Sequence, residues 1–185
     1  MAKHINLPLT KEIAKTLKSG DRVLLSGYIY TSRDAGHKRM VDTLKKEENL
    51  PFDIKDATIY YVGPTPAKPG EVIGSAGPTT SGRMDAYAPV LMKEGARGMI
   101  GKGARSPEVI ESMKKHCCVY FGAIGGAGAL ISKHIKSCET IAYEDLGAEA
   151  LCRLYVENMP LIVIIDCKGN DLYKTGPENY LNKKR

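Results

Sequence analysis

The chain has 185 residues, of which 43% are hydrophobic and 26% are charged, and its formal net charge is +6 at pH 7. This composition is typical of one globular domain and excludes a disordered or fibrous protein. The basic residues are scattered apart from the Lys-Lys-Arg tail and do not alternate with aromatic residues, so we expect a small anionic partner and no nucleic acid.

Apolar runs and helix-period segments alternate along the chain. The expected elements are, in chain order, a helix from Thr10, a strand over residues 22–30, a helix from Ala35, a strand over 58–62, a helix from Ser81, a short strand over 98–100, a helix from Ser106, a strand over 117–121, a helix from Gly126, a short strand over 140–143, a helix from Gly147 and a strand over 161–165. Such alternation predicts an α/β layered domain.

Residues 62–82 interrupt this alternation. Four prolines and several glycines fall in this stretch, which predicts turns and a small sheet or hairpin rather than a helix. No repeat, linker or shift in composition divides the chain, so we expect a single domain over residues 1–185.

The five cysteines carry no metal-binding pattern. None belongs to a C-x-x-C pair, and the adjacent Cys117 and Cys118 would point to opposite faces of a strand. The first residues show no signal peptide, and no stretch is apolar enough to span a bilayer. We therefore expect reduced, mostly buried thiols, a cytoplasmic location and no membrane association.

Residues 77–85 (GPTTSGRMD) combine glycines, hydroxyls and an arginine at the predicted start of a helix. Backbone N–H groups at a helix start have no partner within the helix and attract anions. The hydroxyls of Thr79, Thr80 and Ser81 can bind a ligand or cap the helix, and Arg83 can bind a carboxylate or phosphate with two N–H groups. The sequence leaves two interpretations open: an anion site, or a well-capped helix with a solvated arginine.

Arg33 is a second candidate cation. It follows the strand over residues 22–30 and would lie at the carboxyl end of that strand, where open α/β sheets bind ligands. His37 follows one helical turn later and could share the same helix face. The alternative is that Ser32 or Asp34 caps the helix while Arg33 is exposed.

Lys102 is a third candidate cation, between Gly101 and Gly103 after a short strand. Flanking glycines give a bound anion access to the lysine, although a solvated turn is also compatible with the pattern. If the loops of Arg33, Arg83 and Lys102 converge, their pocket suits a small dianion. The chain has no recognisable nucleophile and base, which indicates half of an active site.

Residues 125–129 (GGAGA) lie between a strand and a helix, where a dinucleotide-binding loop would lie. After Gly126 and Gly128 the third glycine position is Ile131, so the G-x-G-x-x-G pattern is absent. Close packing of a helix on the sheet or a carboxylate-binding loop accounts for these glycines.

Six motifs together resemble, in their order, the C-terminal domain or β subunit of class I, iron–sulfur-dependent fumarate hydratases and the related L-tartrate dehydratases. They are residues 32–37 (SRDAGH), 77–85 (GPTTSGRMD), 101–103 (GKG), 122–126 (GAIGG), 143–150 (YEDLGAEA) and 166–173 (DCKGNDLY). The resemblance implies a swivelling β/β/α domain, with a layered sheet and flanking helices. It also implies a separate α subunit whose cysteines hold a [4Fe–4S] cluster, in a hetero-oligomer for which α2β2 is one candidate form.

The activity that the resemblance implies is reversible hydration of fumarate to L-malate, by an enzyme active only with its α subunit. An L-tartrate dehydratase β subunit is an alternative, and a non-catalytic module that binds phosphate or a nucleotide is another.

The resemblance also implies roles for residues on these loops. Arg33, Arg83 and Lys102 match substrate-carboxylate and electrostatic residues, and Thr79 matches the hydroxyl proposed as base at the substrate carbon. Thr80 is a further candidate for a hydrogen bond to substrate, as is Ser81. Thr79 and Lys102 are thus the expected catalytic residues, and the substrate-binding set is Arg33, Thr79, Thr80, Arg83 and Lys102.

Overall fold

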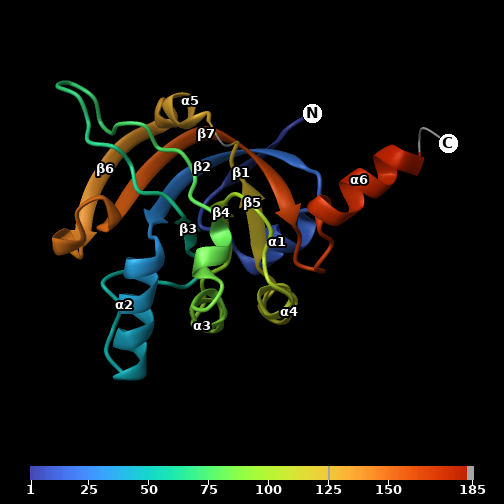
Figure 1. Ribbon diagram of the computed structural model, residues 1–185, viewed down its shortest axis with the longest axis horizontal. Helices are drawn as coiled ribbons and strands as arrows, with labels where there is room; N and C mark the ends of the chain where they lie inside the picture. The colour runs from blue at the N-terminus through green and yellow to red at the C-terminus, as the bar shows by residue number, and fades with distance from the viewer. Residues whose placement is uncertain (125, 183–185) are drawn as a thin grey trace.

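A computed structural model describes residues 1–124 and 126–182. In these residues seven strands form one sheet in the order β1-β2-β3-β4-β5-β7-β6, with a further pairing between β2 and β7 (Figure 1). The strands are β1 (Lys3–Asn6), β2 (Arg22–Thr31), β3 (Thr58–Tyr60), β4 (Gly98–Gly101), β5 (Val119–Gly122), β6 (Ile135–Ala142) and β7 (Leu151–Ile165). The α-helices are α1 (Lys11–Thr16), α2 (Asp34–Lys45), α3 (Ala88–Lys93), α4 (Pro107–His116), α5 (Gly128–Ser132) and α6 (Leu172–Asn182), and the 3-10 helices are η1 (Ser81–Met84) and η2 (Glu144–Glu149).

Five of the strands close into a ring. The pairs β2–β3, β3–β4 and β4–β5 are parallel, and antiparallel pairs join β5 to β7 and β7 back to β2. The ring is barrel-like, because closure leaves few strand edges unpaired. β1 extends the sheet beside the first half of β2, and β6 pairs with the first half of β7.

The barrel separates two hydrophobic clusters. Successive residues of β5 show the division, since Phe121 lies in the cluster inside the ring and Tyr120 in the cluster outside it. The outer cluster contains buried residues of α2, α3 and α4, which Figure 1 shows together on one side of the barrel. This alternation is the period of two that a strand imposes on its side chains.

The expected α/β class is confirmed, and so are two helix starts. The hydroxyls of Thr10 and Ser106 accept hydrogen bonds from the third residue of α1 and of α4 respectively. These side chains satisfy backbone N–H groups that have no partner within the helix, which is why the local signal was reliable.

The helix expected from Gly147 is wrong, because β7 begins at Leu151 and continues for 15 residues. Its first half has β2 on one side and β6 on the other, and this pairing prevails over the helix propensity of the local sequence. The short β1 was not predicted.

The segment 62–80 contains no strand; isolated bridges join Val62 to Pro78 and Thr80 to Lys102, so the expected small sheet or hairpin is wrong. The helix expected from Ser81 is the short η1 followed by α3. The helix expected from Gly126 begins at Gly128.

None of the helices within the described residues is both long enough and apolar enough to cross a membrane.

Candidate functional site

The candidate residues lie at one edge of the barrel. Strands β2, β3 and β4 are parallel, so the loops that follow them leave at the same edge. Arg33 follows β2 and Lys102 follows β4, whereas Thr79 reaches this edge at the end of the long connection from β3. The Thr79 N–H donates to the Tyr61 carbonyl at 2.7 Å, which anchors the returning segment beside β3. The three predicted loops therefore converge.

Arg33 is held between η2 and the start of α2. Its Nη2 lies 3.2 Å from Glu149 Oε1, and its side chain is 23% exposed. A Cβ atom at Gly63 would lie 2.8 Å from Arg33 Nη1, so the guanidinium packs directly against backbone. Glu149 also accepts a hydrogen bond from Ala35 N, which places this carboxylate at the amino end of α2.

The alternative in which Ser32 or Asp34 caps α2 is wrong. Arg33 itself occupies the N-cap position, and no side chain at that position makes a capping hydrogen bond. Asp34 instead links the two arginines, since its Oδ2 lies 2.6 Å from Arg83 Nη2 and its Oδ1 lies 3.9 Å from Arg33 Nε. Burial opposes ionisation, but the hydrogen bond and charge of Arg83 and the charge of Arg33 lower the pKa of Asp34.

The Lys102 loop is fastened to the segment of Thr80 and Ser81. Ser81 N donates to the Lys102 carbonyl at 2.9 Å, beside the bridge between Thr80 and Lys102. Beneath them the Tyr120 hydroxyl donates to the Gly103 carbonyl at 2.9 Å and lies 2.9 Å from Ser81 Oγ. A single buried hydroxyl thus holds both loops.

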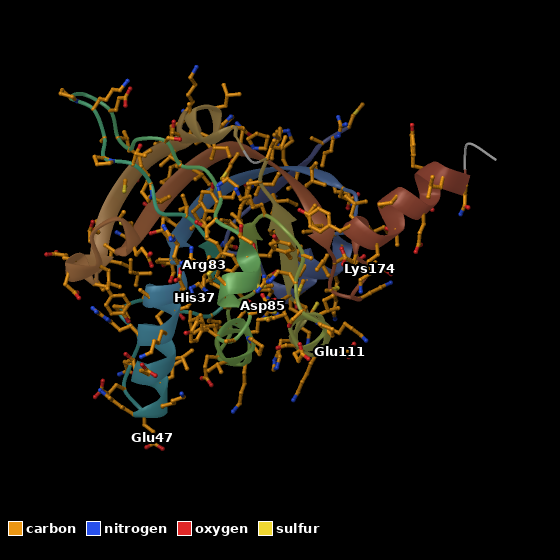
Figure 2. All side chains as sticks on the ribbon, in the orientation of Figure 1. His37, Glu47, Arg83, Asp85, Glu111 and Lys174 are labelled. Atoms are coloured by element: carbon orange, nitrogen blue, oxygen red, sulfur yellow. The ribbon has the colours of Figure 1, made fainter. Side chains whose placement is uncertain are left out.

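Asp85 and Arg105 join the same two loops a second time. Arg105 Nε donates to Asp85 Oδ1 at 2.7 Å, and Asp85 Oδ2 accepts from Ser106 N at 2.7 Å. The Arg105 side chain has no exposed surface, and its guanidinium lies 5.3 Å and 5.1 Å from the ring centres of Tyr61 and Tyr120. In Figure 2 Asp85 and Arg83 both project from the region around η1.

Three of the predicted groups have no partner among the described residues. The hydroxyls of Thr79 and Thr80 make no hydrogen bond, and the Lys102 ammonium makes no ion pair. Thr80 is the N-cap residue of η1 but makes no capping bond, so the well-capped helix considered above is wrong. Arg33 Nε is buried without a hydrogen-bond partner. An ammonium and two hydroxyls are therefore available to an anion.

Comparison with known proteins identifies the family of this chain. The family described as fumarase C-terminus matches residues 1–176. This chain belongs to that family.

Named relatives fall into two groups by length. The chain is 40% identical over 175 residues to "Fumarate hydratase class I, aerobic" of Escherichia coli (strain K12), and the match covers 92% of this chain and 32% of that protein. "Fumarate hydratase 2" of Leishmania major is 39% identical, with 83% of this chain and 28% of that protein covered. The chain thus spans about a third of these relatives.

A relative of similar length is the "Putative L(+)-tartrate dehydratase subunit beta" of Methanocaldococcus jannaschii. It is 38% identical over 172 residues, which cover 90% of this chain and 88% of that protein.

His37 has a structural position in this member of the fumarase C-terminus family. Its side chain is fully buried, with Nδ1 2.9 Å from the Arg33 carbonyl and 2.9 Å from Ser32 Oγ. Burial lowers the pKa of His37 to about 4, so its ring is neutral at neutral pH. His37 therefore supports the turn that presents Arg33 and does not share the exposed face with it.

The glycine-rich loop before α5 allows close packing against the segment 62–80. Ala76 N donates to the Gly128 carbonyl at 3.2 Å, and a Cβ atom on Gly128 would lie 2.8 Å from Gly77 N. The atoms nearest to that Cβ belong to Ser75 and Gly77, so Gly128 lets α5 pack on a loop and not on the sheet as expected, while Gly125 lies outside the described residues.

The described residues contain no group of three or more His, Cys, Asp or Glu side chains that could hold a metal ion. All five cysteines are free thiols. Cys117, Cys118 and Cys152 are buried, whereas Cys138 and Cys167 are partly buried. The adjacent Cys117 and Cys118 contact different hydrophobic clusters, as expected, but they precede β5 rather than lying in it.

Sequence analysis assigned no role to Asp34, Glu149, Asp85, Arg105 or Tyr120. Asp34 was considered only as a cap, and the residue types gave no signal for the other contacts because their partners lie 17 to 116 positions away in the chain. The adjacent opposite charges of Arg33 and Asp34 were the one local signal that could have suggested an ion-pair network.

Proposed function

We propose that this chain is the β subunit of a hydro-lyase that reversibly hydrates fumarate to L-malate. The observation that supports the proposal most is the convergence of Arg33, Arg83 and Lys102 at one barrel edge, beside the unpaired hydroxyls of Thr79 and Thr80. The family membership and the names of its relatives agree with this activity.

The charges of the site match one carboxylate of a dicarboxylate substrate. The cations are Arg33, Arg83 and Lys102, and the carboxylates of Asp34 and Glu149 offset two of them. One net positive charge remains. This chain would thus bind one substrate carboxylate and leave the other to a partner subunit.

Proton transfer in the proposal takes place at the Thr79 hydroxyl. A threonine hydroxyl is a weak base unless nearby cations stabilise its alkoxide, and Lys102 and Arg83 lie on the loops around it. Removal of a proton from the substrate carbon leaves negative charge that extends into the adjacent carboxylate. The fixed ammonium and guanidinium groups would stabilise this charge without rearranging.

The [4Fe–4S] cluster implied by the resemblance does not fit this chain. A cluster needs three or four thiolates around one point, whereas here Cys117 neighbours Cys167, Cys138 neighbours Cys152, and Cys118 belongs to neither pair. We therefore assign the cluster to a separate α subunit. The relative of similar length is named a subunit beta, which supports a partner of this kind.

The proposal retains the finer expectations as well: a swivelling β/β/α domain over residues 1–185, a cytoplasmic hetero-oligomer, and α2β2 as one form to test. Size-exclusion chromatography with light scattering on the co-expressed pair measures the stoichiometry directly.

The activity test uses this chain assembled with its cluster-bearing partner, reconstituted without oxygen. We expect loss of fumarate and formation of L-malate. An assembled pair with an intact cluster that is inactive on fumarate, malate and tartrate would contradict the proposal.

Arg83→Ala tests the site itself. It should lower kcat/KM by about 10²–10³-fold, because a charged donor at a developing anion is lost. Arg39→Ala is the matched control, since Arg39 forms an exposed ion pair with Asp145 at 2.7 Å and is not one of the predicted site residues. We expect the control to change kcat/KM less than about twofold. Equal effects of the two variants would remove Arg83 from the site.

L-Tartrate is the second candidate substrate. The observation in its favour is the name of the Methanocaldococcus jannaschii relative, which matches this chain over most of both lengths. The ratio of kcat/KM for L-tartrate and L-malate, measured on one preparation of the assembled pair, decides between the substrates.

A further inference from the structure

A second basic site lies at the opposite end of the barrel. The candidate active site is at the carboxyl ends of β2, β3 and β4, whereas this hollow lies at the amino end of β5, beside the carboxyl end of the antiparallel β7. Its volume is about 550 Å³, and it is lined by Lys11, Lys15, Lys114, Lys115, Cys117, Cys167 and Lys168. The last two belong to the motif over residues 166–173, to which the proposed reaction gives no role.

The charge of the hollow is almost uncompensated. No carboxylate lines it, and the one ion pair among its lysines joins Lys114 to Glu111 at 2.7 Å. The other four form no ion pair with any described residue: Lys11, Lys15, Lys115 and Lys168. The nearest acidic neighbours in sequence are Glu12 on α1 and the buried Asp166. Like charges around a concave surface repel one another and focus positive potential into it.

One lysine of the hollow, Lys115, also adds positive charge around a neighbouring side chain. Burial and the positive charges of Lys115, Arg97 and Lys93 together lower the pKa of His116, the last residue of α4. Nearby cations disfavour a further positive charge, and the same field attracts an anion.

The turn that presents Lys168 is held in place. Asp166 Oδ1 accepts hydrogen bonds from the N–H groups of Lys168 at 2.9 Å and Asn170 at 3.1 Å. Gly169 has φ +84°, and a Cβ atom there would lie 2.8 Å from Lys114 Cδ. A residue with a side chain would be strained at this φ and would displace the Lys114 side chain. The glycine therefore lets two lysines from distant parts of the chain face the same hollow.

Two adjacent thiols, those of Cys117 and Cys167, lie at the floor of the hollow. Cys117 ends α4 in the left-handed conformation, with φ 55°, and its thiol, which neighbours that of Cys167, donates to the Lys11 carbonyl at 3.9 Å. Burial and this contact with Cys117 raise the pKa of Cys167 to about 11. The two thiols therefore give the floor of the hollow a weakly polar surface and do not form a nucleophilic site.

We propose that this hollow binds a linear polyphosphate group, of the kind found in tripolyphosphate and nucleoside triphosphates. Its size falls within the range of small-molecule sites. Ammonium groups bind phosphate as point charges from several directions, which suits lysines supplied by α1, α4 and the turn after β7. A single carboxylate would leave most of these charges unmatched. A nucleic acid would need a continuous basic track, whereas this site is a bounded hollow.

The first test is calorimetric titration of the full chain with tripolyphosphate at low ionic strength. We expect a Kd on the order of 10–100 µM that weakens as salt is added. A variant with Lys15→Gln, Lys115→Gln and Lys168→Gln should bind at least about tenfold more weakly, because each lost ion pair removes a fraction of the binding free energy. The matched control carries three changes on α2 and just after it: Lys38→Gln, Lys45→Gln and Lys46→Gln. Circular dichroism establishes that both variants are folded.

Absence of binding, or equal weakening in the two variants, would overturn the proposal. Binding of inorganic phosphate as tight as that of tripolyphosphate would do the same, because a single phosphate group does not require several lysines. Affinity for single-stranded oligonucleotides that exceeds that for tripolyphosphate and rises with their length would assign the surface to nucleic acid instead.

A second set of measurements tests whether the ligand lies in the hollow, and whether the natural ligand is a nucleotide or an inorganic polyphosphate. Tripolyphosphate should slow alkylation of Cys167, followed by mass spectrometry, and a dicarboxylate at equal ionic strength should not. No protection of Cys167 would contradict this location. Tighter binding of a nucleoside triphosphate than of tripolyphosphate indicates a nucleotide, and equal binding indicates the inorganic chain. None of these measurements depends on hydratase activity.

Discussion

The buried His37 should make the chain lose stability in mild acid. Its ring lies beneath the Arg33 turn with no exposed surface, and burial lowers its pKa from 6.5 to about 4. In the unfolded chain the ring has its ordinary pKa, so below pH 6.5 the unfolded state binds a proton that the folded state does not. The contribution of His37 to stability is therefore complete above pH 6.5 and is lost as the pH falls toward 4.

The size of this loss follows from the two pKa values. Each pKa unit corresponds to about 1.4 kcal/mol, so His37 should account for about 3 kcal/mol of the free energy of unfolding between pH 6.5 and pH 4. That is a large fraction of the stability of an ordinary domain, about 5–15 kcal/mol. The pKa of Asp34 is lowered from 3.8, so its titration falls below this range.

The assay is urea unfolding of the wild type and of His37→Asn at pH 7 and at pH 4. The asparagine amide can still donate to the Arg33 carbonyl but does not titrate, so the variant should lose about 3 kcal/mol less than the wild type between the two pH values. His116→Asn, at a partly buried position at the end of α4, is the control and should keep most of the wild-type loss. Identical losses in the wild type and His37→Asn would refute the reasoning, as would a titration of the His37 ring by NMR with a midpoint above pH 6.

Three further predictions concern the loops and the thiols. Asp85→Asn should lower the free energy of unfolding by about 3–5 kcal/mol, because the buried Arg105 guanidinium loses its counterion; an unchanged urea midpoint would contradict this. Gly101→Ala should cost about 1–3 kcal/mol, since the added Cβ would collide with Ser81 Oγ, whereas Gly82→Ala in the facing loop meets its nearest atom at 4.0 Å and should cost less than about 1 kcal/mol. An iron chelator should leave the thermal midpoint of the isolated chain unchanged, because the described residues offer no cluster of metal ligands; a lower midpoint would reveal a bound metal.

Much of the fold and the outline of the site could be predicted from local patterns in the sequence. Thr10 and Ser106 mark helix starts because each hydroxyl binds an N–H group only three residues away. Arg33 and Lys102 were predictable for a related reason, since each follows directly on a strand that its own apolar run defines. Signals of this kind act over one turn or one strand, where the sequence neighbours are also the spatial neighbours.

The remaining features depend on residues far apart in the chain. The residues that begin β7 were predicted as helix, and their extended form comes from β2 and β6 on either side. Asp34 is of a residue type preferred at helix N-caps, yet it pairs with Arg83, 49 positions later in the chain. The sequence by itself determined the α/β class, the helix starts and which loops carry cations. Only the tertiary structure decided that the sheet closes into a ring and that Asp34 and Asp85 fasten those loops together, because hydrogen-bonded pairing and buried charge depend on distant partners that no local window of sequence contains.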